Sequence, residues 1–322
     1  MYRRWFVQSL ISSTIWGVGS KANARAGTQL RIVFPFPAGG SGGALARLVA
    51  DWLAVGLGQP AIVENKPGAG GRIGVLTVKN APPDGMTLLL SPIAPMAVYQ
   101  HVYKSLGYDP LADFRPITQI ATFEFGLAVG AGVPARTVAE LVAWVKAHPE
   151  LASYGSPAPG TLPHFLGVQF GQSVGINWRH VGYGANARPI NDLIAGHIPI
   201  AFHSTNELAE FHKAGRIRVL ATSADRRSVF VPEVPTFREA GYEIEATGWF
   251  GLFAPANTPD AIVDQLNRAI VAALQSADAK ARIQALGLNA AGTSAEAFAD
   301  IQRADVARWA PAVRDSGFTA EE

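Results

Sequence analysis

The sequence predicts an α/β fold of two lobes with a hinge and a cleft between them. Strand-like runs alternate with helix-like segments along the chain, which favours parallel sheets covered on both faces. The segments form two groups, from Thr28 to about residue 127 and from about residue 128 to residue 243. Residues 244–322 are too rich in helix to form a sheet of their own, so we expect them to return to the first lobe. The two crossings between lobes would then form a hinge.

The first group is expected to alternate three strands with three helices. Strands are predicted at Leu30–Phe36, Ala61–Val63 and Thr87–Leu90, with helices after Ser41 and at Arg72–Lys79 and Pro95–Tyr103. Ser41 can cap the first helix, because a serine hydroxyl accepts a hydrogen bond from the first turn. The apolar residues that follow it lie at helical spacing, and Gly58 ends the helix.

The second group repeats this alternation. Strands are predicted at Phe125–Val129, Leu151–Tyr154, Ile198–Phe202 and Ile217–Thr222, and helices at Thr137–Ala147, Thr161–Val174, Asn186–Ala195 and Glu207–Lys213. Thr137 and Glu140 have the spacing of a capping box. A strand at Gly248–Phe253 and helices near Pro259–Gln275, Ala277–Leu286 and Ser294–Ser316 complete the chain.

The first 26 residues have the pattern of a secretory signal peptide. Arg3 and Arg4 precede an uncharged, largely apolar run of about 14 residues, and Ala-x-Ala sites end at Ala24 and Ala26. The run is shorter than the about 20 residues that span a bilayer. We therefore expect export to the periplasm through the general secretory route. The paired arginines leave the twin-arginine route as an alternative.

Composition excludes several classes of function. The full chain has 27 basic and 25 acidic residues, and removing the four basic residues of the leader leaves a net charge of −2. Such a chain has no global field that attracts nucleic acid. The chain contains no cysteine, which excludes disulfides and thiolate metal sites. No histidine or carboxylate cluster has metal-ligand spacing, so we expect neither a metal nor a cofactor.

Two loops carry the features of an anion site. Each follows a predicted strand and leads into a helix: 36–41 (FPAGGS) in the first group and 155–161 (GSPAPGT) in the second. Free N–H groups and the positive end of the helix dipole favour a carboxylate at such a turn. Glycine lets a ligand approach the backbone closely. Since each lobe contributes one loop, a carboxylate ligand could be held from both sides.

Other residues at predicted strand ends are also candidates. His164, in the first turn after the second loop, could donate to a carboxylate or pack against the loop. The Tyr183 hydroxyl could face the cleft from a strand-to-loop corner, and His203 ends a strand at its rim. Trp249 is interpreted as core or hinge packing.

An enzymatic alternative also follows from the glycine-rich loop. Gly39-Gly40-Ser41-Gly42-Gly43 matches the G-x-S-x-G motif of serine hydrolases, between a strand and a helix. This motif would lie on the first strand, and no oxyanion loop precedes it. A dinucleotide site, with Glu64 as the ribose-binding acid, is weaker, because the third small residue of G-x-G-x-x-G is absent.

Several stretches resemble the periplasmic solute-binding receptors of tripartite tricarboxylate transporters, also called Bug proteins. The matching blocks run in family order and are VFPFPAGG (33–40), VENKPGAGGRIG (63–74), APPDGMTLLLS (81–91), YDPLADF (108–114), YGSPAPGTLPH (154–164), INDLIAGHI (190–198), PEVPTFREAGY (232–242) and WFGLFAPANTP (249–259). The resemblance implies a type II periplasmic-binding-protein fold and closure around one small carboxylate. It also implies delivery of that ligand to the permease subunits in the membrane.

The combined expectation is a monomeric receptor without catalytic residues, which could also feed a sensor kinase. Its parts are the leader (1–26), lobe 1 (27–127 plus 244–322) and lobe 2 (128–243). The family's ligand loops map onto 36–41 and 156–164. The candidate ligand-binding residues are Phe36, Ala38, Gly39, Gly40, Ser41, Ser91, Ser156, Gly160, Thr161, His164, Tyr183 and His203.

Two departures from the family pattern narrow the range of ligands that we expect. Family members usually have an aspartate two residues after the position of Ser41, where this chain has Gly43. Without that acid an amino group has no partner, which favours simple or aromatic carboxylates over amino acids. The V-P-Y-K-G corner of the family is Val181-Gly182-Tyr183-Gly184-Ala185 here, so it keeps the tyrosine and loses the lysine and proline.

Overall fold

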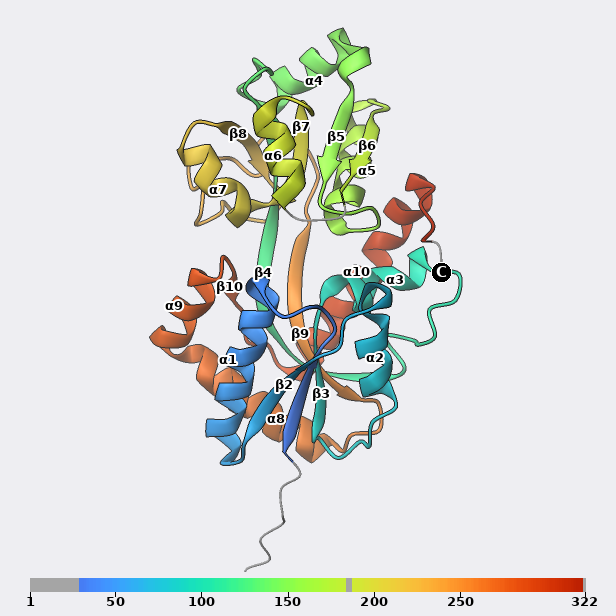
Figure 1. Ribbon diagram of the computed structural model, residues 1–322, viewed down its shortest axis with the longest axis vertical. Coiled ribbons are helices and arrows are strands. Elements are labelled where there is room, and N and C mark those ends of the chain that lie inside the picture. Colours follow the sequence, from blue (N-terminus) through green and yellow to red (C-terminus); the bar gives the residue numbers. More distant parts are fainter. Residues whose placement is uncertain (1–28, 184–186, 321–322) are drawn as a thin grey trace, which may run out of the picture.

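The structure is a computed structural model that describes residues 29–183 and 187–320; the expected leader lies outside them. Figure 1 shows two lobes, one above the other, joined by the long strand β4 (Phe114–Gly130) and by β9 (Thr247–Pro255). The N-terminal third and the C-terminal helices build the lower lobe, and the middle of the chain builds the upper one. No helix among the described residues is long and apolar enough to cross a membrane.

The lower lobe contains a mixed sheet in the order β2-β1-β3-β9-β4. Strands β1 (Leu30–Phe34), β2 (Ala61–Asn65) and β3 (Thr87–Pro92) are parallel, whereas β9 is antiparallel to both β3 and β4. The two-residue strand β10 (Asn289–Ala290) adds to β4. The last strands of the chain therefore lie in the same sheet as the first.

Helices cover both faces of this sheet, because alternate residues of its strands point to opposite faces. On one face, α1 (Gly40–Leu57), α8 (Asp260–Gln275) and α9 (Ala277–Ala285) bury Leu30, Ile32 and Leu90. On the other, Val33 and Leu89 pack with the core under the remaining helical elements. These are η1 (Ala69–Gly71), α2 (Arg72–Lys79), the π-helical turn η2 (Ala94–Val98), α3 (Tyr99–Val102) and α10 (Ala295–Ser316).

The upper lobe has its own sheet, in which β5 is parallel to β6 and β7. Its strands are β5 (Ser153–Ser156), β6 (Arg179–Gly182), β7 (Ile200–Ser204) and β8 (Ile217–Thr222). Its helices are α4 (Val138–Ala147), η3 (Pro149–Leu151), α5 (Leu162–Val174), α6 (Ala187–Ala195) and α7 (Thr205–Lys213). The Thr137 hydroxyl accepts from the Glu140 N–H at 3.2 Å, as the predicted capping motif requires.

Strand β4 belongs to both sheets. Its residues up to Glu124 pair with β9 and β10, and from Phe125 onward they pair with β7 and β8. Sequence periodicity predicted only the second half, Phe125–Val129. The first half carries Pro116, Thr118 and Gln119 and has register shifts at two points, which hides its alternation.

Other local expectations were wrong in informative ways. The N-cap of α1 is Gly39, not Ser41, so the helix starts two residues earlier than expected. Gly39 and Gly40 have positive φ angles, of 114° and 61°. The helix expected at Pro95–Tyr103 is a π-helical turn followed by one short α-helical turn. The short strand β10 was not foreseen, and β6 was foreseen only as a strand-to-loop corner.

Candidate ligand-binding cleft

A cavity of about 350 Å3 lies between the two lobes. The lower lobe contributes Phe34, Phe36, Gly40, Ser41, Gly42, Pro92, Ile93, Ala94, Tyr99 and Phe250, the crossing strand β4 contributes Phe123 and Phe125, and the upper lobe contributes Pro157, Thr161, Leu162, Pro163 and Ser204. The cavity lies at the carboxyl ends of β1, β3 and β7, where α/β proteins place their ligand sites. Both predicted anion loops therefore border one space.

The start of α1 forms the lower wall of the cavity. Gly39 has no side chain to cap the helix, so the first-turn N–H groups receive no acceptor from the N-cap residue. A Cβ built on Gly40 meets nothing within 4 Å, which leaves its backbone open to an approaching ligand. The loop before it is held by Asn65, whose Nδ2 donates to the Phe36 carbonyl at 3.0 Å. This wall can donate hydrogen bonds to one carboxylate.

The upper wall is built differently, because its polar groups bind one another. The Thr161 hydroxyl donates to the Ala158 carbonyl at 2.7 Å, and the Gly160 N–H donates to His164 Nδ1 at 3.1 Å. The residue after Leu162 is Pro163, which has no N–H. These two donors are therefore engaged within the loop, although Thr161 gives the first turn of α5 no side-chain cap.

Two histidines support this loop from behind. The rings of His164 and His180 stack at 3.9 Å between centroids, and His180 Nε2 lies 2.7 Å from Ser156 Oγ. Burial lowers the pKa of His164 to about 4. Burial and the neighbouring His164 lower that of His180 to about 3. Both rings are neutral at pH 7. Of the two alternatives for His164, the structure favours packing against the loop, because its ring accepts a hydrogen bond from Gly160 there.

The structure brings Phe36, Gly40, Ser41 and Thr161 together and leaves the other predicted site residues outside the lining of the cavity. Ala38 and Gly39 are exposed at its rim, whereas Ser156 and Gly160 are buried within the upper loop. The rest are engaged in contacts within the protein. Ser91 is fully buried and donates to the Pro92 carbonyl, Tyr183 donates to Asp192 at 2.7 Å, and His203 is buried in β7 with its Nε2 3.7 Å from Glu207.

The sequence interpretation missed the aromatic residues of the cleft. Phe123 and Phe125 line it from β4, and Phe250 lines it from β9. Phe123 contacts both of the others, with ring centroids 5.5 Å apart in each pair. Phe123 and Phe125 flank Glu124 and therefore share one face of a strand. This pattern was a usable signal, but the predicted strand began only at Phe125, whereas β4 begins at Phe114.

A serine–histidine hydrogen bond does occur, but it does not form a hydrolase centre. Its serine is Ser156, which is completely buried and also 3.3 Å from the Ala158 carbonyl, so the pair supports the loop. Ser41, the expected nucleophile of that alternative, lies at the start of α1 in the cavity wall. Among residues 29–183 and 187–320, no group of three histidine, aspartate or glutamate side chains could hold a metal ion.

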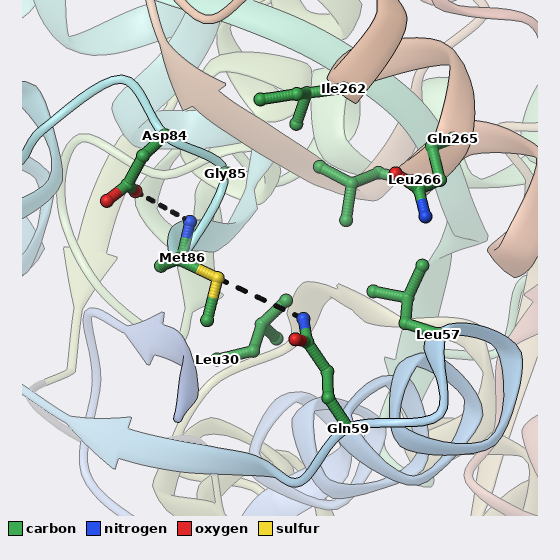
Figure 2. A pocket seen from close by; sticks show the side chains of 9 residues that line it. All are labelled: Leu30, Leu57, Gln59, Asp84, Gly85, Met86, Ile262, Gln265 and Leu266. Carbon is green, nitrogen blue, oxygen red and sulfur yellow. Dashed lines mark hydrogen bonds between the residues drawn. The ribbon is translucent and has the colours of Figure 1, made fainter. Parts of the chain in front are cut away.

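Figure 2 shows another cavity, of about 200 Å3, in the lower lobe. It is bordered by Leu30, Gln59 and Met86, at the amino ends of the strands and therefore opposite the cleft. Asp84 accepts from the Met86 N–H at 2.9 Å, and the Gln59 amide contacts the Met86 sulfur at 3.9 Å. Since the side chains in Figure 2 all belong to one lobe, closure of the cleft cannot enclose a ligand there.

Comparison with known proteins agrees with this geometry. Residues 45–318 match the sequence profile described as "Tripartite tricarboxylate transporter family receptor". The chain is 34% identical to the protein BugT of Bordetella pertussis over 294 residues, 89% of each chain. The adipate-bound structure of Rpa4515 from Rhodopseudomonas palustris is 30% identical, with a TM-score of 0.78 over 90% of this chain and 98% of that one. MatC from the same organism, with bound malate, is 26% identical, with a TM-score of 0.74 over 88% and 98% of the two chains.

Proposed function

This chain belongs to the family of tripartite tricarboxylate transporter receptors, and from that premise we propose that it captures a small carboxylate in its cleft and delivers it to a membrane permease. The family consists of periplasmic solute-binding proteins, so the chain is a binding protein with the two-lobe α/β fold and not an enzyme. Bound adipate and malate in two similar structures support a carboxylate ligand. The serine-hydrolase alternative is thereby set aside.

One observation carries the proposal: a single cavity contacts the uncapped start of α1 in one lobe and the loop before α5 in the other. A carboxylate there accepts hydrogen bonds from the α1 N–H groups and interacts favourably with the helix dipole. Contact with both loops favours the closed arrangement, because a ligand shifts a population toward the state that it binds more tightly. A dissociation constant of ~1 μM corresponds to about −8 kcal/mol, which several charge-assisted hydrogen bonds in an enclosed site can supply.

The proposal also covers the division of the chain into lobes and the location of the mature protein. We assign 27–127 with 244–322 to lobe 1 and 128–243 to lobe 2, which the change of pairing partners in β4 after Glu124 supports. Residues 1–26 act as a leader that is removed on export, and the mature receptor acts as a monomer in the periplasm. The candidate ligand residues are those of the cavity wall, with Gly40, Ser41 and Thr161 at the two loops.

Ligand binding can be tested directly by a thermal-shift screen of small carboxylates, followed by calorimetry on those that stabilise the protein. A ligand at 100 times its dissociation constant adds about 2.7 kcal/mol to the free energy of unfolding. Matched neutral amides of the same acids serve as controls, because they keep the shape and remove the charge. If no carboxylate raises the melting temperature more than its amide, the proposed function is wrong.

Two variants on α1 locate the site. Ser41→Phe places a ring in the cavity next to the helix start and should weaken binding at least tenfold without unfolding the protein, because Ser41 is only half-buried. Val55→Ala is the control on the same helix, because Val55 lies in α1 far along from the cavity and its side chain is 86% exposed. The affinity of this variant should remain that of the wild type, because Val55 is absent from the lining of the cavity. Unchanged affinity in Ser41→Phe would place the ligand elsewhere.

A further inference from the structure

We infer that the ligand is an aromatic monocarboxylate, and that dicarboxylates such as those bound by the similar structures are disfavoured. This inference rests on the proposed function and narrows the chemistry of the same cleft. Six aromatic side chains line the cavity: Phe34, Phe36, Tyr99, Phe123, Phe125 and Phe250. None of the described residues lining it carries a charge.

The aromatic side chains come from the lower lobe and from the crossing strand β4. Phe34 and Phe36 lie at the end of β1 with ring centroids 5.8 Å apart, and Phe250 of β9 lies 5.5 Å from Phe123. Aromatic rings prefer offset or edge-to-face neighbours, and such contacts add to the burial of apolar area. A flat ring therefore gains more from this cavity than a flexible aliphatic chain of equal volume.

Among the described residues, the two walls offer different numbers of free donors to a carboxylate. Neither helix start has a side-chain cap, but α5 lacks one first-turn N–H because Pro163 follows Leu162. The start of α1 offers N–H groups that the N-cap residue leaves uncapped. Opposite it, the Gly160 N–H and the Thr161 hydroxyl are bonded within their own loop, and Pro157 and Pro163 have no N–H. A second carboxylate at that end would lose its hydration and gain fewer partners than the first carboxylate gains at α1.

The lateral extension of the cleft is also unfavourable to a second carboxylate. An adjoining cavity of about 170 Å3 shares Ser41, Phe123, Ser204 and Phe250 with the main one and is lined by Glu207. A carboxylate that reached this compartment would be repelled by the like charge of Glu207. The second compartment therefore disfavours a longer diacid.

The arginines near the hinge do not relieve this repulsion. Arg226 and Arg227 line another cavity together with Glu124. Phe123 and Phe125 point into the cleft, and Glu124 lies between them in the strand, so its side chain points to the opposite face. Strand β4 therefore separates these guanidinium groups from the aromatic cavity.

The test compares four acids by calorimetry on the wild-type protein. Benzoate and cyclohexanecarboxylate have the same charge and similar size but differ in the ring; terephthalate adds a second carboxylate to benzoate, and adipate is an aliphatic diacid. We expect benzoate to bind roughly two- to tenfold more tightly than cyclohexanecarboxylate and at least tenfold more tightly than either diacid. Tighter binding of a diacid than of benzoate overturns the inference and leaves the carboxylate receptor intact. Binding of none of the acids contradicts the proposed function itself.

Two variants test whether Phe36 and Glu207 set the preference for an aromatic monocarboxylate. Phe36→Leu should bring the benzoate-to-cyclohexanecarboxylate ratio close to one, whereas Phe211→Leu, the same change outside the cavity in α7, should leave it unchanged. Glu207→Gln should improve terephthalate binding relative to benzoate by severalfold. If Phe36→Leu keeps the ratio and Glu207→Gln leaves terephthalate binding unchanged, the cavity does not select the ligand in this way.

Discussion

At the scale of single residues, the stacked pair His164 and His180 predicts a pH-dependent stability. Their pKa values are about 4 and about 3 in the folded protein, against 6.5 for an unperturbed histidine. Between these values the unfolded chain binds more protons than the folded one, so the free energy of unfolding rises with pH. Each ring should lower it by on the order of 2 kcal/mol as the pH drops from 6.5 to 4. Urea denaturation at several pH values measures it.

The variant His180→Gln checks the origin of this effect. It removes one titrating ring while keeping a polar side chain near Ser156, so the dependence on pH between 4 and 6.5 should become weaker. His197→Gln is the control, because that side chain is exposed. A His180→Gln protein with the wild-type pH dependence would assign the titration to other groups.

The same residues show which parts of the site a sequence can predict. Turn chemistry and family resemblance identified the two loops, and Phe36, Gly40, Ser41 and Thr161 do line one cavity. Neither could show that the His164 ring accepts from its own loop, since the direction of a hydrogen bond depends on backbone geometry over several residues. The aromatic walls were missed for a related reason: a phenylalanine in a strand is as typical of a core as of a ligand site.

At the scale of elements, the position of the tail after α10 (residues 317–320) predicts that lobe 1 stabilises the ligand loop of lobe 2. Phe318 lies so close to Gly160 that a Cβ there would be 2.6 Å from its ring, and it meets the His164 ring edge-on at 5.5 Å. The Ala320 N–H donates to the Val102 carbonyl at 3.1 Å, which fixes the tail to α3. Phe318→Ala should weaken ligand binding roughly two- to tenfold, because the loosened loop then loses more conformational entropy when the ligand binds.

Hydrogen exchange separates this effect from a general loss of stability. In Phe318→Ala, amides of 156–165 should exchange faster while those of β1 and β3 keep their protection. Phe318→Leu retains most of the apolar contact and should remain close to the wild type in both measurements. Uniformly faster exchange in Phe318→Ala would mean that the tail stabilises the whole molecule and not the loop.

The extent of sequence prediction also differs between elements. Helices with clear apolar periodicity and a capping residue, such as Thr137 for α4, were placed within one residue, and β8 was predicted with its observed bounds. The first half of β4 was missed because its pattern is set by two register shifts and by pairing with β9, which lies more than 120 residues later in the chain. Local patterns cannot encode a partner so distant.

At the scale of the whole molecule, Glu124 joins the two lobes at the crossing strand. Its Oε1 accepts from Ser228 Oγ, in the segment that follows β8, and its Oε2 accepts from Asn289 Nδ2 of β10 at 3.2 Å. Burial raises the pKa of this carboxyl group, while both hydrogen bonds oppose the shift. A carboxylate can satisfy both donors, whereas the amide in Glu124→Gln keeps one acceptor oxygen. Because its NH2 group can donate to Ser228 Oγ, the variant can keep both partners, but the contact with Ser228 reverses direction and should weaken.

The weakening should appear in the separation of the lobes, since each contact belongs to a different lobe. We expect the saturating ligand to decrease the radius of gyration of the wild type in small-angle X-ray scattering, as closure requires. Glu124→Gln should start from a different ligand-free radius and change its affinity, while its saturated radius matches the wild type, because the ligand then sets the closed state. Identical curves for the two proteins with and without ligand would show that Glu124 stabilises the strand without controlling the hinge.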